Sequence, residues 1–420
     1  MSAPPPRRGP RPLLLHLTLA MLKSSASLGV SPSWSGASPI WSAAAIEEVR
    51  RIIAGLPERE DASPSAVLAE ALRQDRDLIA GIAAYRRHPW RRDLPDPPAI
   101  WSEGETRLLD YGGEGPPLFI VPSLVNRGYV LDLAPGHSMA RFLAAQGARV
   151  LLLDWGWPAA LERTFTLTDY VAGRLERALQ ACGRPVVLVG YCMGGLLTAA
   201  AAQRRPDLVH ALALLATPWD FHASGSAEPR ALARLLPVLE PLIANANALP
   251  IDALQVMFAM LEPYGVGGKY RSFGKLDPAG ERARLFVALE DWLNDGVPLA
   301  APVARECLRG WYGANTPAQR EWRIAGQVVE PAGLRMPTLV VAPARDRIVP
   351  GESARPLAAA IPGAKLLEPS AGHIGMVAGS SAERALWRPL LDWVVSVAGA
   401  KTLASGASRP KVRRRGVSPA

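Results

Sequence analysis

The 420-residue sequence contains only three cysteines, too few and too widely spaced for a disulfide scaffold or a Cys-x-x-Cys metal site. No apolar run reaches the roughly 18 residues that a membrane-spanning helix needs. Charged residues make up 20% of the chain and hydrophobic residues 49%, a balance that excludes a mostly disordered protein. The length and composition favour one large α/β domain with an insertion, or two domains.

The sequence also lacks the motifs of the common cofactor sites. It contains no Gly-x-Gly-x-x-Gly dinucleotide loop, no phosphate-binding loop ending in Gly-Lys-Ser or Gly-Lys-Thr, no His-Glu-x-x-His zinc motif and no EF-hand loop. We therefore expect no metal and no nucleotide cofactor. The chain shows no internal repeat either.

The formal net charge of +9 resembles that of a protein that binds nucleic acid. Ten of the positive charges, however, lie in the two ends of the chain, where there are no acids. They are Arg7, Arg8, Arg11, Lys23, Lys401, Arg409, Lys411, Arg413, Arg414 and Arg415. Removing these ten from +9 leaves −1 for the span between them. We therefore expect a near-neutral folded body that does not bind nucleic acid.

The ends of the chain are expected to differ from its body. Residues 1–45 form a predicted extension, partly disordered, in which 13–22 (LLLHLTLAML) make an apolar helix. A secretory signal peptide is the alternative, but His16 and Lys23 break its pattern and no Ala-x-Ala cleavage site follows. Residues 401–420 are predicted to be a disordered basic tail.

Between these ends, the pattern predicts an α/β protein with helical additions. The predicted segments are an N-terminal helical segment at 46–95, an α/β core at 96–218 and 334–400, and a helical cap insertion at 219–333. The expected strands of the core are 118–121, 150–153, 186–189, 211–215 and 338–342. The expected helices are 46–54, 65–86, 138–146, 167–182, 195–204, 357–361 and 384–397. This alternation predicts a mostly parallel central sheet with helices on both faces.

The most specific motif is the segment 186–195, VVLVGYCMGG, which joins a predicted strand to a predicted helix. It has the form Gly-x-nucleophile-x-Gly, the nucleophile elbow of the α/β-hydrolase fold. The turn forces Cys192 into a strained conformation, and Gly190 and Gly194 leave room for it. The helix N-terminus favours negative charge on the thiol and places the Met193 N–H where an oxyanion would form. The alternative is a buried structural cysteine in a glycine-rich turn.

A nucleophile of this kind needs a base, and three histidines follow Cys192 in the chain. His210 lies in a polar turn that enters a strand, and His222 opens the cap. His373 lies in the glycine-rich loop SAGHIG after the last predicted strand, where this fold places its base. We therefore predict that His373 is the base.

The acid that orients this base is expected after the preceding strand. Asp346, in PARDRIVP, follows the predicted strand 338–342 and is the favoured candidate. Asp220, in TPWDF, is the alternative, because some enzymes of this fold carry the acid one strand earlier. Asp154, at the end of an earlier strand, is expected to form local hydrogen bonds.

A second oxyanion donor is expected from the loop after the strand 118–121. This loop reads PSLVNR over residues 122–127 and lacks the His-Gly-Gly-Gly form of many esterases. The backbone N–H groups of Leu124 and Val125 are both candidates, and we take Val125 as the prediction.

In this order, the motifs resemble those of the polyhydroxyalkanoate (poly-3-hydroxybutyrate) synthases, the cysteine-nucleophile branch of the α/β-hydrolase superfamily. The resemblance runs from about residue 84 to about residue 397. The segments that carry it are 121–127, 131–133, 153–156, 168–170, 190–195, 217–221, 290–292, 346–350 and 372–375. By this resemblance, Cys192 carries the acyl group, His373 is the base and Asp346 is its partner. The Leu-rich start and the basic tail belong neither to the long single-subunit synthases nor to the short two-subunit ones.

The resemblance implies an acyltransferase that polymerises (R)-3-hydroxyacyl-CoA to polyhydroxyalkanoate, with CoA release through a covalent acyl-Cys intermediate. It implies a CoA thioester as substrate without a further cofactor, a growing polyester chain, a homodimer or second synthase subunit, and a cytoplasmic, granule-associated location. The alternative is a hydrolase with the same triad, such as an intracellular polyester depolymerase, a thioesterase or a lactone hydrolase. A non-catalytic granule-surface protein is a third interpretation, and the intact Cys, Asp and His set argues against it.

Overall fold

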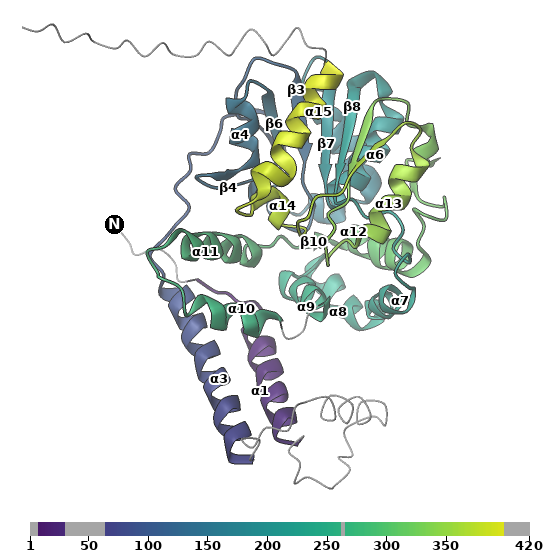
Figure 1. Cartoon of the computed structure of the whole chain (residues 1–420). Helices are drawn as coiled ribbons and strands as arrows, with labels where there is room; N and C mark the ends of the chain where they lie inside the picture. The colour runs from purple at the N-terminus through teal and green to yellow at the C-terminus, as the bar shows by residue number, and fades with distance from the viewer. Residues whose placement is uncertain (1–6, 30–63, 262–264, 399–420) are drawn as a thin grey trace, which may run out of the picture. The chain divides into compact units, whose positions relative to one another are not determined.

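The computed structural model describes residues 7–29, 64–261 and 265–398, which fall into two compact units (Figure 1). Unit 1 groups the described part of Met1–Arg91 with Gln255–Asn294, and unit 2 groups Arg92–Leu254 with the described part of Asp295–Ala420. The interval 219–333, expected to form one cap, therefore divides between the two units. The helix expected at 46–54 and the basic tail lie outside the described residues. Within the described ranges, no helix is both long and apolar enough to cross a membrane.

Unit 2 is built on an eight-stranded sheet with the strand order β1-β2-β6-β3-β7-β8-β13-β14. Its strands are β1 (Ala99–Glu103), β2 (Thr106–Asp110), β3 (Pro117–Val121), β6 (Arg149–Asp154), β7 (Val186–Tyr191), β8 (Val209–Leu215), β13 (Thr338–Val341) and β14 (Lys365–Leu367). β1 pairs antiparallel with β2, and β2 pairs antiparallel with β6; the other pairs are parallel. Every residue of β3 and β7 is buried, as expected for strands covered on both faces. The predicted mostly parallel sheet is confirmed.

The helices of unit 2 cover both faces because the chain reverses direction across the sheet. From β3 it passes through α4 (Met139–Ala145) to β6, and from β7 it passes the other way through α6 (Met193–Arg204) to β8. Since such crossovers are right-handed, opposite directions place α4 and α6 on opposite faces. In Figure 1, α15 (Arg388–Ala398) crosses the face turned to the viewer. The reversal brings the carboxyl ends of β3 and β7 together, and sheets of this type bind ligands at such a point.

Shorter elements surround the sheet of unit 2. They are η1 (Gly128–Leu131), β4 (Asp132–Ala134), β5 (His137–Ser138), η2 (Glu162–Thr164), η3 (Asp169–Leu175), α5 (Glu176–Gln180), η4 (Pro206–Leu208), α7 (Ala227–Ala233), α8 (Leu236–Ala246), β9 (Ala248–Leu249), β10 (Leu299–Ala300), α12 (Ala301–Glu306), η5 (Cys307–Ala314), β11 (Arg323–Ile324), β12 (Gln327–Val328), η6 (Pro331–Gly333), α13 (Gly351–Ala360), α14 (Gly375–Ala378) and η7 (Glu383–Trp387). Three of them, η3, η5 and η7, are π-helices.

In the segment after β3, the carboxylate of Asp132 accepts hydrogen bonds from four side chains. Asp132 is fully buried and accepts hydrogen bonds from Arg92 (2.9 Å), Arg141 (2.7 Å), Ser138 (2.6 Å) and Tyr111 (3.1 Å). A buried carboxylate is tolerated when its oxygens are paired in this way. The segment 131–133 of the resemblance is therefore structural.

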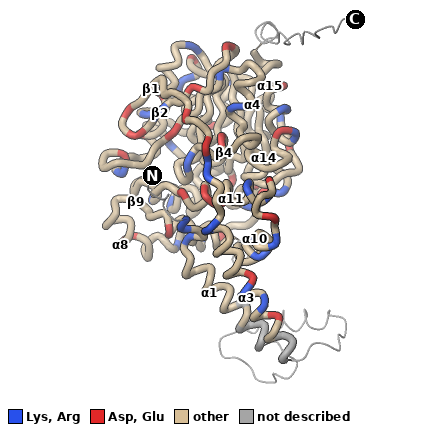
Figure 2. The backbone as a smooth tube through the Cα atoms, turned by 90° about the vertical axis from the view of Figure 1, so that its left-hand side faces the viewer, with Lys and Arg blue, Asp and Glu red and all other residues tan. Residues whose placement is uncertain are grey.

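Figure 2 shows Lys and Arg interspersed with Asp and Glu along the backbone of unit 2.

Unit 1 is a group of helices. They are α1 (Leu13–Gly29), α3 (Pro64–Arg87), α10 (Gly265–Phe273), α11 (Glu281–Asn294) and most of α9 (Ile251–Leu261). The buried core residues of this group are Leu78, Ile82, Tyr85, Tyr270, Phe273, Ala283 and Val287. The predicted helix 65–86 matches α3, and the predicted helix 13–22 lies within α1.

Two acids of α11 satisfy the buried hydroxyl groups of this core. Tyr85 and Tyr270 meet edge to face with their ring centroids 5.6 Å apart. Tyr270 donates to Glu290 at 2.7 Å, and Tyr85 donates to Asp291 at 2.9 Å. The segment 290–292 of the resemblance therefore contributes to packing in unit 1.

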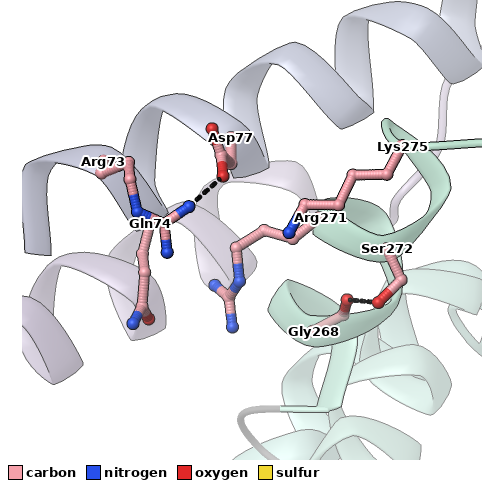
Figure 3. Close-up of a pocket in the computed structure, with 7 residues that line it drawn as sticks. All are labelled: Arg73, Gln74, Asp77, Gly268, Arg271, Ser272 and Lys275. Atoms are coloured by element: carbon pink, nitrogen blue, oxygen red, sulfur yellow. Dashed lines mark hydrogen bonds and ion pairs between the residues drawn. The ribbon is translucent and has the colours of Figure 1, made fainter. Parts of the chain in front are cut away.

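A pocket of about 340 Å³ lies between α3 and α10 in unit 1 (Figure 3). Arg73 and Asp77 of α3 face Arg271 of α10 and Lys275, which follows the end of that helix. Arg73 is already held by ion pairs with Glu70 at 2.7 Å and with Asp77 at 2.8 Å. None of the residues predicted to carry chemistry lines this pocket.

Candidate active site

Cys192 forms the turn between β7 and α6, with φ 56° and ψ −127°. A positive φ costs a residue other than glycine about 1–3 kcal/mol, so the surroundings must hold this conformation. Two backbone hydrogen bonds do so. Cys192 donates its N–H to the Leu215 carbonyl at 2.8 Å, and Gly195 donates its N–H to the Cys192 carbonyl at 2.9 Å. The structure thus has the strained elbow that the motif predicts.

The two elbow glycines lie where segments of backbone approach closely. A Cβ atom on Gly194 would be 2.2 Å from the carbonyl oxygen of Val121, and one on Gly190 would be 2.2 Å from Thr198 Oγ1. Real Cβ atoms essentially never approach within 3.0 Å of another atom. Gly194 therefore allows the start of α6 to reach the end of β3, and Gly190 allows β7 to reach α6.

Cys192, His373 and Asp346 come together in unit 2 from three separate loops. His373 Nδ1 is 2.7 Å from Asp346 Oδ2, and the Asp346 side chain is fully buried. Asp346 Oδ1 accepts two further hydrogen bonds of 2.9 Å, from the N–H groups of Ile348 and Val349. The Cys192 thiol lies within hydrogen-bonding reach of the imidazole. Because the carboxylate occupies Nδ1, the ring nitrogen that remains for the thiol is Nε2.

Burial and the two neighbouring side chains, Cys192 and Asp346, set the charge of the His373 imidazole. Burial is the largest and by itself lowers the pKa of His373. Negative charge on Cys192 and the hydrogen bond to Asp346 oppose burial, and the net result raises this pKa to about 10. A negative charge on Cys192 therefore favours the protonated form of His373.

Asp220, the alternative acid, accepts hydrogen bonds from groups other than His373. Its Oδ1 accepts hydrogen bonds from Asn315 Nδ2 at 2.8 Å and from the N–H of His222 at 2.9 Å. Asn315, buried at the end of η5, accepts a bond of 2.9 Å from the N–H of Phe221. Asp220 thus fixes the end of η5, while Asp346 is the carboxylate bonded to the histidine.

The two predicted oxyanion donors differ in their surroundings. Met193 begins α6, and the first N–H groups of a helix have no partner inside the helix. The Val125 N–H donates to Ser123 Oγ at 3.1 Å, and the Val125 carbonyl accepts from Val297 at 3.1 Å. Val125 must leave Ser123 before it can serve an oxyanion. Its role stays a prediction, with Leu124 as the alternative.

Tyr191 is a residue of this site that sequence reasoning missed. It is buried directly before Cys192, and its ring lies over the His373 ring with a centroid separation of 5.1 Å and an interplanar angle of 33°. Its hydroxyl donates to the backbone carbonyl of His373 at 3.3 Å. The two residues are 182 positions apart, so no local pattern indicates the contact. The only sign of this contact in the sequence is the aromatic residue directly before the nucleophile.

The remaining candidates have structural roles. His210 is exposed on β8, and its ring is 2.9 Å from a carbonyl of α15. His222 Nε2 is 2.8 Å from the Tyr312 carbonyl. Asp154 accepts a hydrogen bond of 2.8 Å from Arg107, in agreement with the local role expected for it. In the described part of the chain, no cluster of three or more His, Cys, Asp or Glu could hold a metal ion. The expected lack of a cofactor stays a prediction.

Comparisons with known proteins agree with the fold described above. A family model described as the alpha/beta hydrolase fold matches residues 116–250. The poly(3-hydroxyalkanoate) polymerase subunit PhaC of Haloferax mediterranei is 30% identical over 309 residues, which are 70% of this chain and 62% of that protein. The protein of the same name from Synechocystis is 30% identical over 296 residues, 66% of this chain and 77% of that protein. A solved alpha/beta hydrolase fold protein from Nakamurella multipartita is 18% identical, with a TM-score of 0.43, over 73% of this chain and 99% of that one.

The family model covers only part of the site. The family model includes Cys192 and ends before Asp346 and His373. The chain spans 62% of the length of the Haloferax protein and 77% of that of the Synechocystis protein. The resemblance drawn from the motifs is thereby confirmed, and the chain belongs to the poly(3-hydroxyalkanoate) polymerase family, with an α/β-hydrolase fold.

Proposed function

We propose that this chain is an acyltransferase that polymerises (R)-3-hydroxyacyl-CoA to polyhydroxyalkanoate and releases CoA. The observation that carries the proposal is the position of His373, which bonds to Asp346 at 2.7 Å and reaches the Cys192 thiol. The substrate class follows from the relatives, which are named poly(3-hydroxyalkanoate) polymerase subunits. Cys192 is the nucleophile, His373 the base and Asp346 the acid that orients the base.

The first half-reaction loads the enzyme. Cys192 Sγ attacks the carbonyl carbon of the acyl-CoA thioester, and the thiol proton passes to His373 Nε2. The developing oxyanion lies at the N-terminus of α6, beside the Met193 N–H. The bond between the acyl carbon and the CoA sulfur then breaks, and CoA leaves as a thiol with the proton from His373. Asp346 keeps the Nδ1 proton in place throughout.

The second half-reaction forms the ester. The hydroxyl of a 3-hydroxyacyl unit gives its proton to His373 and attacks the acyl carbon on Cys192. As the new ester bond forms, the bond to Cys192 Sγ breaks, and the sulfur regains a proton from His373. A cysteine nucleophile suits this sequence because one thioester replaces another at nearly even free energy. The acyl group therefore stays activated for transfer to an alcohol.

A hydrolase is the second candidate, as an intracellular polyester depolymerase, a thioesterase or a lactone hydrolase. It is favoured by the match to a family model described by the hydrolase fold. It would use the same three residues, with water in place of the alcohol.

The deciding experiment incubates the purified full chain with 3-hydroxybutyryl-CoA and measures CoA release together with polymer. CoA release with polymer supports the polymerase, whereas CoA release with only free 3-hydroxybutyrate supports the hydrolase. Cys192→Ala should abolish both products, because alanine fits the elbow while the nucleophile is lost. Near wild-type turnover in a folded Cys192→Ala variant would refute the proposed nucleophile.

The partners follow from the same proposal. We expect the CoA thioester and the growing polyester to be the only ligands of the reaction, with no added cofactor. A homodimer or a second synthase subunit fits relatives that are named as subunits. A cytoplasmic location at the granule surface is the expectation that goes with the proposed polyester product. Sedimentation of the full chain with and without substrate will show whether it self-associates.

A further inference from the structure

The loop that carries His373 is tied unequally to its two neighbours in the site. Two backbone hydrogen bonds join it to the loop of the acid, from Ala344 to Pro369 at 2.9 Å and from Arg345 to Ala371 at 3.0 Å. Among the backbone bonds of the described residues, none joins it to the elbow. Within the described residues, the direct links between the base loop and the elbow are therefore made by side chains.

Tyr191 supplies that connection. It is the last residue of β7, and the strand fixes its backbone on the elbow side. Its hydroxyl donates to the carbonyl oxygen of His373 at 3.3 Å. Burial, followed by the negative charges at Cys192 and Asp346, raises the pKa of this hydroxyl far above its usual value, so it remains a donor. A single side chain thus links the residue before the nucleophile to the backbone of the base.

The ring of Tyr191 makes a second contact with the base. Its centroid is 5.1 Å from that of the His373 imidazole, with the two planes 33° apart. An aromatic face at this distance attracts a cation, and the attraction grows when the pair is shielded from water. The groups that face the imidazole are Cys192 and Tyr191 from the elbow and Asp346 from the loop after β13. Tyr191 is the neutral member of this set.

We propose that Tyr191 is a positioning residue that clamps the base loop to the nucleophile elbow and stabilises the imidazolium form of His373. This inference rests on the proposed roles of Cys192 and His373. The hydroxyl sets the distance between base and nucleophile, and the ring face favours the protonated imidazole that accompanies a thiolate. Substitutions that remove the hydroxyl and the ring separately will therefore have different effects.

The test compares Tyr191→Phe, which keeps the ring, with Tyr191→Leu, which removes it. Matched controls are Tyr170→Phe and Tyr170→Leu. Tyr170 is equally buried in unit 2, with its ring against Trp155 at a centroid distance of 5.4 Å. These controls lose the same groups from the core without touching the base loop.

The first measurement is the rate of iodoacetamide alkylation of the full chain as a function of pH. Burial raises the pKa of Cys182 to about 11 and that of Cys307 well above its usual value, so the fast phase reports Cys192. We expect Tyr191→Leu to lower this rate about tenfold at pH 7 and to move its pH midpoint upward by about one unit. Tyr191→Phe should alkylate at a rate within about twofold of the wild type, because it keeps the ring.

The second measurement is turnover of the acyl-CoA substrate. Tyr191→Phe should lower kcat about three- to tenfold with KM unchanged, the expected effect of one lost hydrogen bond. Tyr191→Leu should lower kcat at least tenfold, while the Tyr170 variants lower only the melting temperature. Equal kcat and equal alkylation profiles for folded Tyr191→Leu and Tyr170→Leu would overturn the proposal. A Tyr191→Phe variant with wild-type kcat would overturn the hydroxyl clamp.

Alkylation needs no acyl substrate, so it separates this inference from the proposed function. If the wild type forms no polymer but the alkylation profile of Tyr191→Leu still shifts as expected, only the proposed polymerase activity is refuted. Polymer formation with no shift in the Tyr191→Leu profile would refute the stabilisation of the imidazolium by the Tyr191 ring and leave the proposed function standing.

Discussion

Replacing Asp346 with asparagine tests which carboxylate orients the base. Asp346 Oδ1 accepts the N–H groups of Ile348 and Val349 at 2.9 Å, and Oδ2 accepts from His373 Nδ1 at 2.7 Å. An asparagine in the same pose must keep its oxygen toward the two N–H groups, because an amide NH₂ cannot accept from them. Its NH₂ then faces Nδ1, which becomes an acceptor. The ring proton moves to Nε2, and the base can no longer take the proton of Cys192.

The expected loss in turnover is roughly 10²–10⁴-fold. The upper figure is the cost of the equivalent aspartate-to-asparagine change in a serine protease. It corresponds to about 5.4 kcal/mol of transition-state stabilisation, at about 1.36 kcal/mol for each factor of ten. The lower figure allows for the thiol, which ionises more readily than a hydroxyl and needs less help. Asp220→Asn keeps the oxygen that accepts from Asn315 and His222, so its turnover should fall by at most about threefold.

The assay is CoA release from 3-hydroxybutyryl-CoA by the wild type, Asp346→Asn and Asp220→Asn, each with its melting temperature. The two substitutions have the same size and chemistry, so any difference reflects position. A folded Asp346→Asn variant within tenfold of the wild type would contradict the tautomer argument. A greater loss in a folded Asp220→Asn variant would move the acid to the loop after β8.

Two further predictions concern packing and charge at the elbow. Gly195→Ala would put a Cβ 1.8 Å from Thr217 Oγ1 and should lower the free energy of unfolding by about 1–3 kcal/mol in denaturant titrations. Gly173→Ala, whose Cβ would have no neighbour closer than 3.5 Å, is the control and should cost nothing. Cys192→Ala removes the negative charge that opposes burial, so the pKa of His373 should fall well below about 10 in an NMR titration of its ring protons. An unchanged pKa would mean that Asp346 alone raises it.

The parallel centre of the fold could be predicted because fully buried strands leave short apolar runs. The predicted strand 186–189 lies within β7, and the run 338–342 corresponds to β13 apart from its last residue. β14 has two exposed residues and one half-buried residue, so it leaves no such run. The π-helix η3 lies within the predicted helix 167–182, and its wider turn could not be foreseen from a period of 3.6 residues.

Cys192 and His373 could be selected from the sequence because chain order and loop position limit the choices. The choice between Asp220 and Asp346 could not be settled from the sequence. Each follows a buried strand, and β8 and β13 are neighbours, so both carboxylates start from the same edge of the sheet. Only the bonds made by Asn315 and His373 distinguish them.

The division of the interval 219–333 could not be predicted for a related reason. An amphipathic pattern shows that one face of a helix is buried, but it does not show which partner covers that face. α10 and α11 pack with α3, although residues Arg92–Leu254 of unit 2 lie between α3 and these helices in the sequence. The helical segment near the N-terminus and part of the insertion therefore form one unit.

This discontinuity affects how the chain folds during synthesis. The apolar face of α3, with Leu78, Ile82 and Tyr85, leaves the ribosome long before Tyr270 of α10, one of the residues that cover it. At about 5–20 residues per second, the roughly 185 residues between Tyr85 and Tyr270 take on the order of 10–40 s to make. During that time, of the described helices of unit 1, only α1, made before α3, can cover part of this face. The rest of the hydrophobic surface of α3 stays exposed on the nascent chain, where chaperones can bind it.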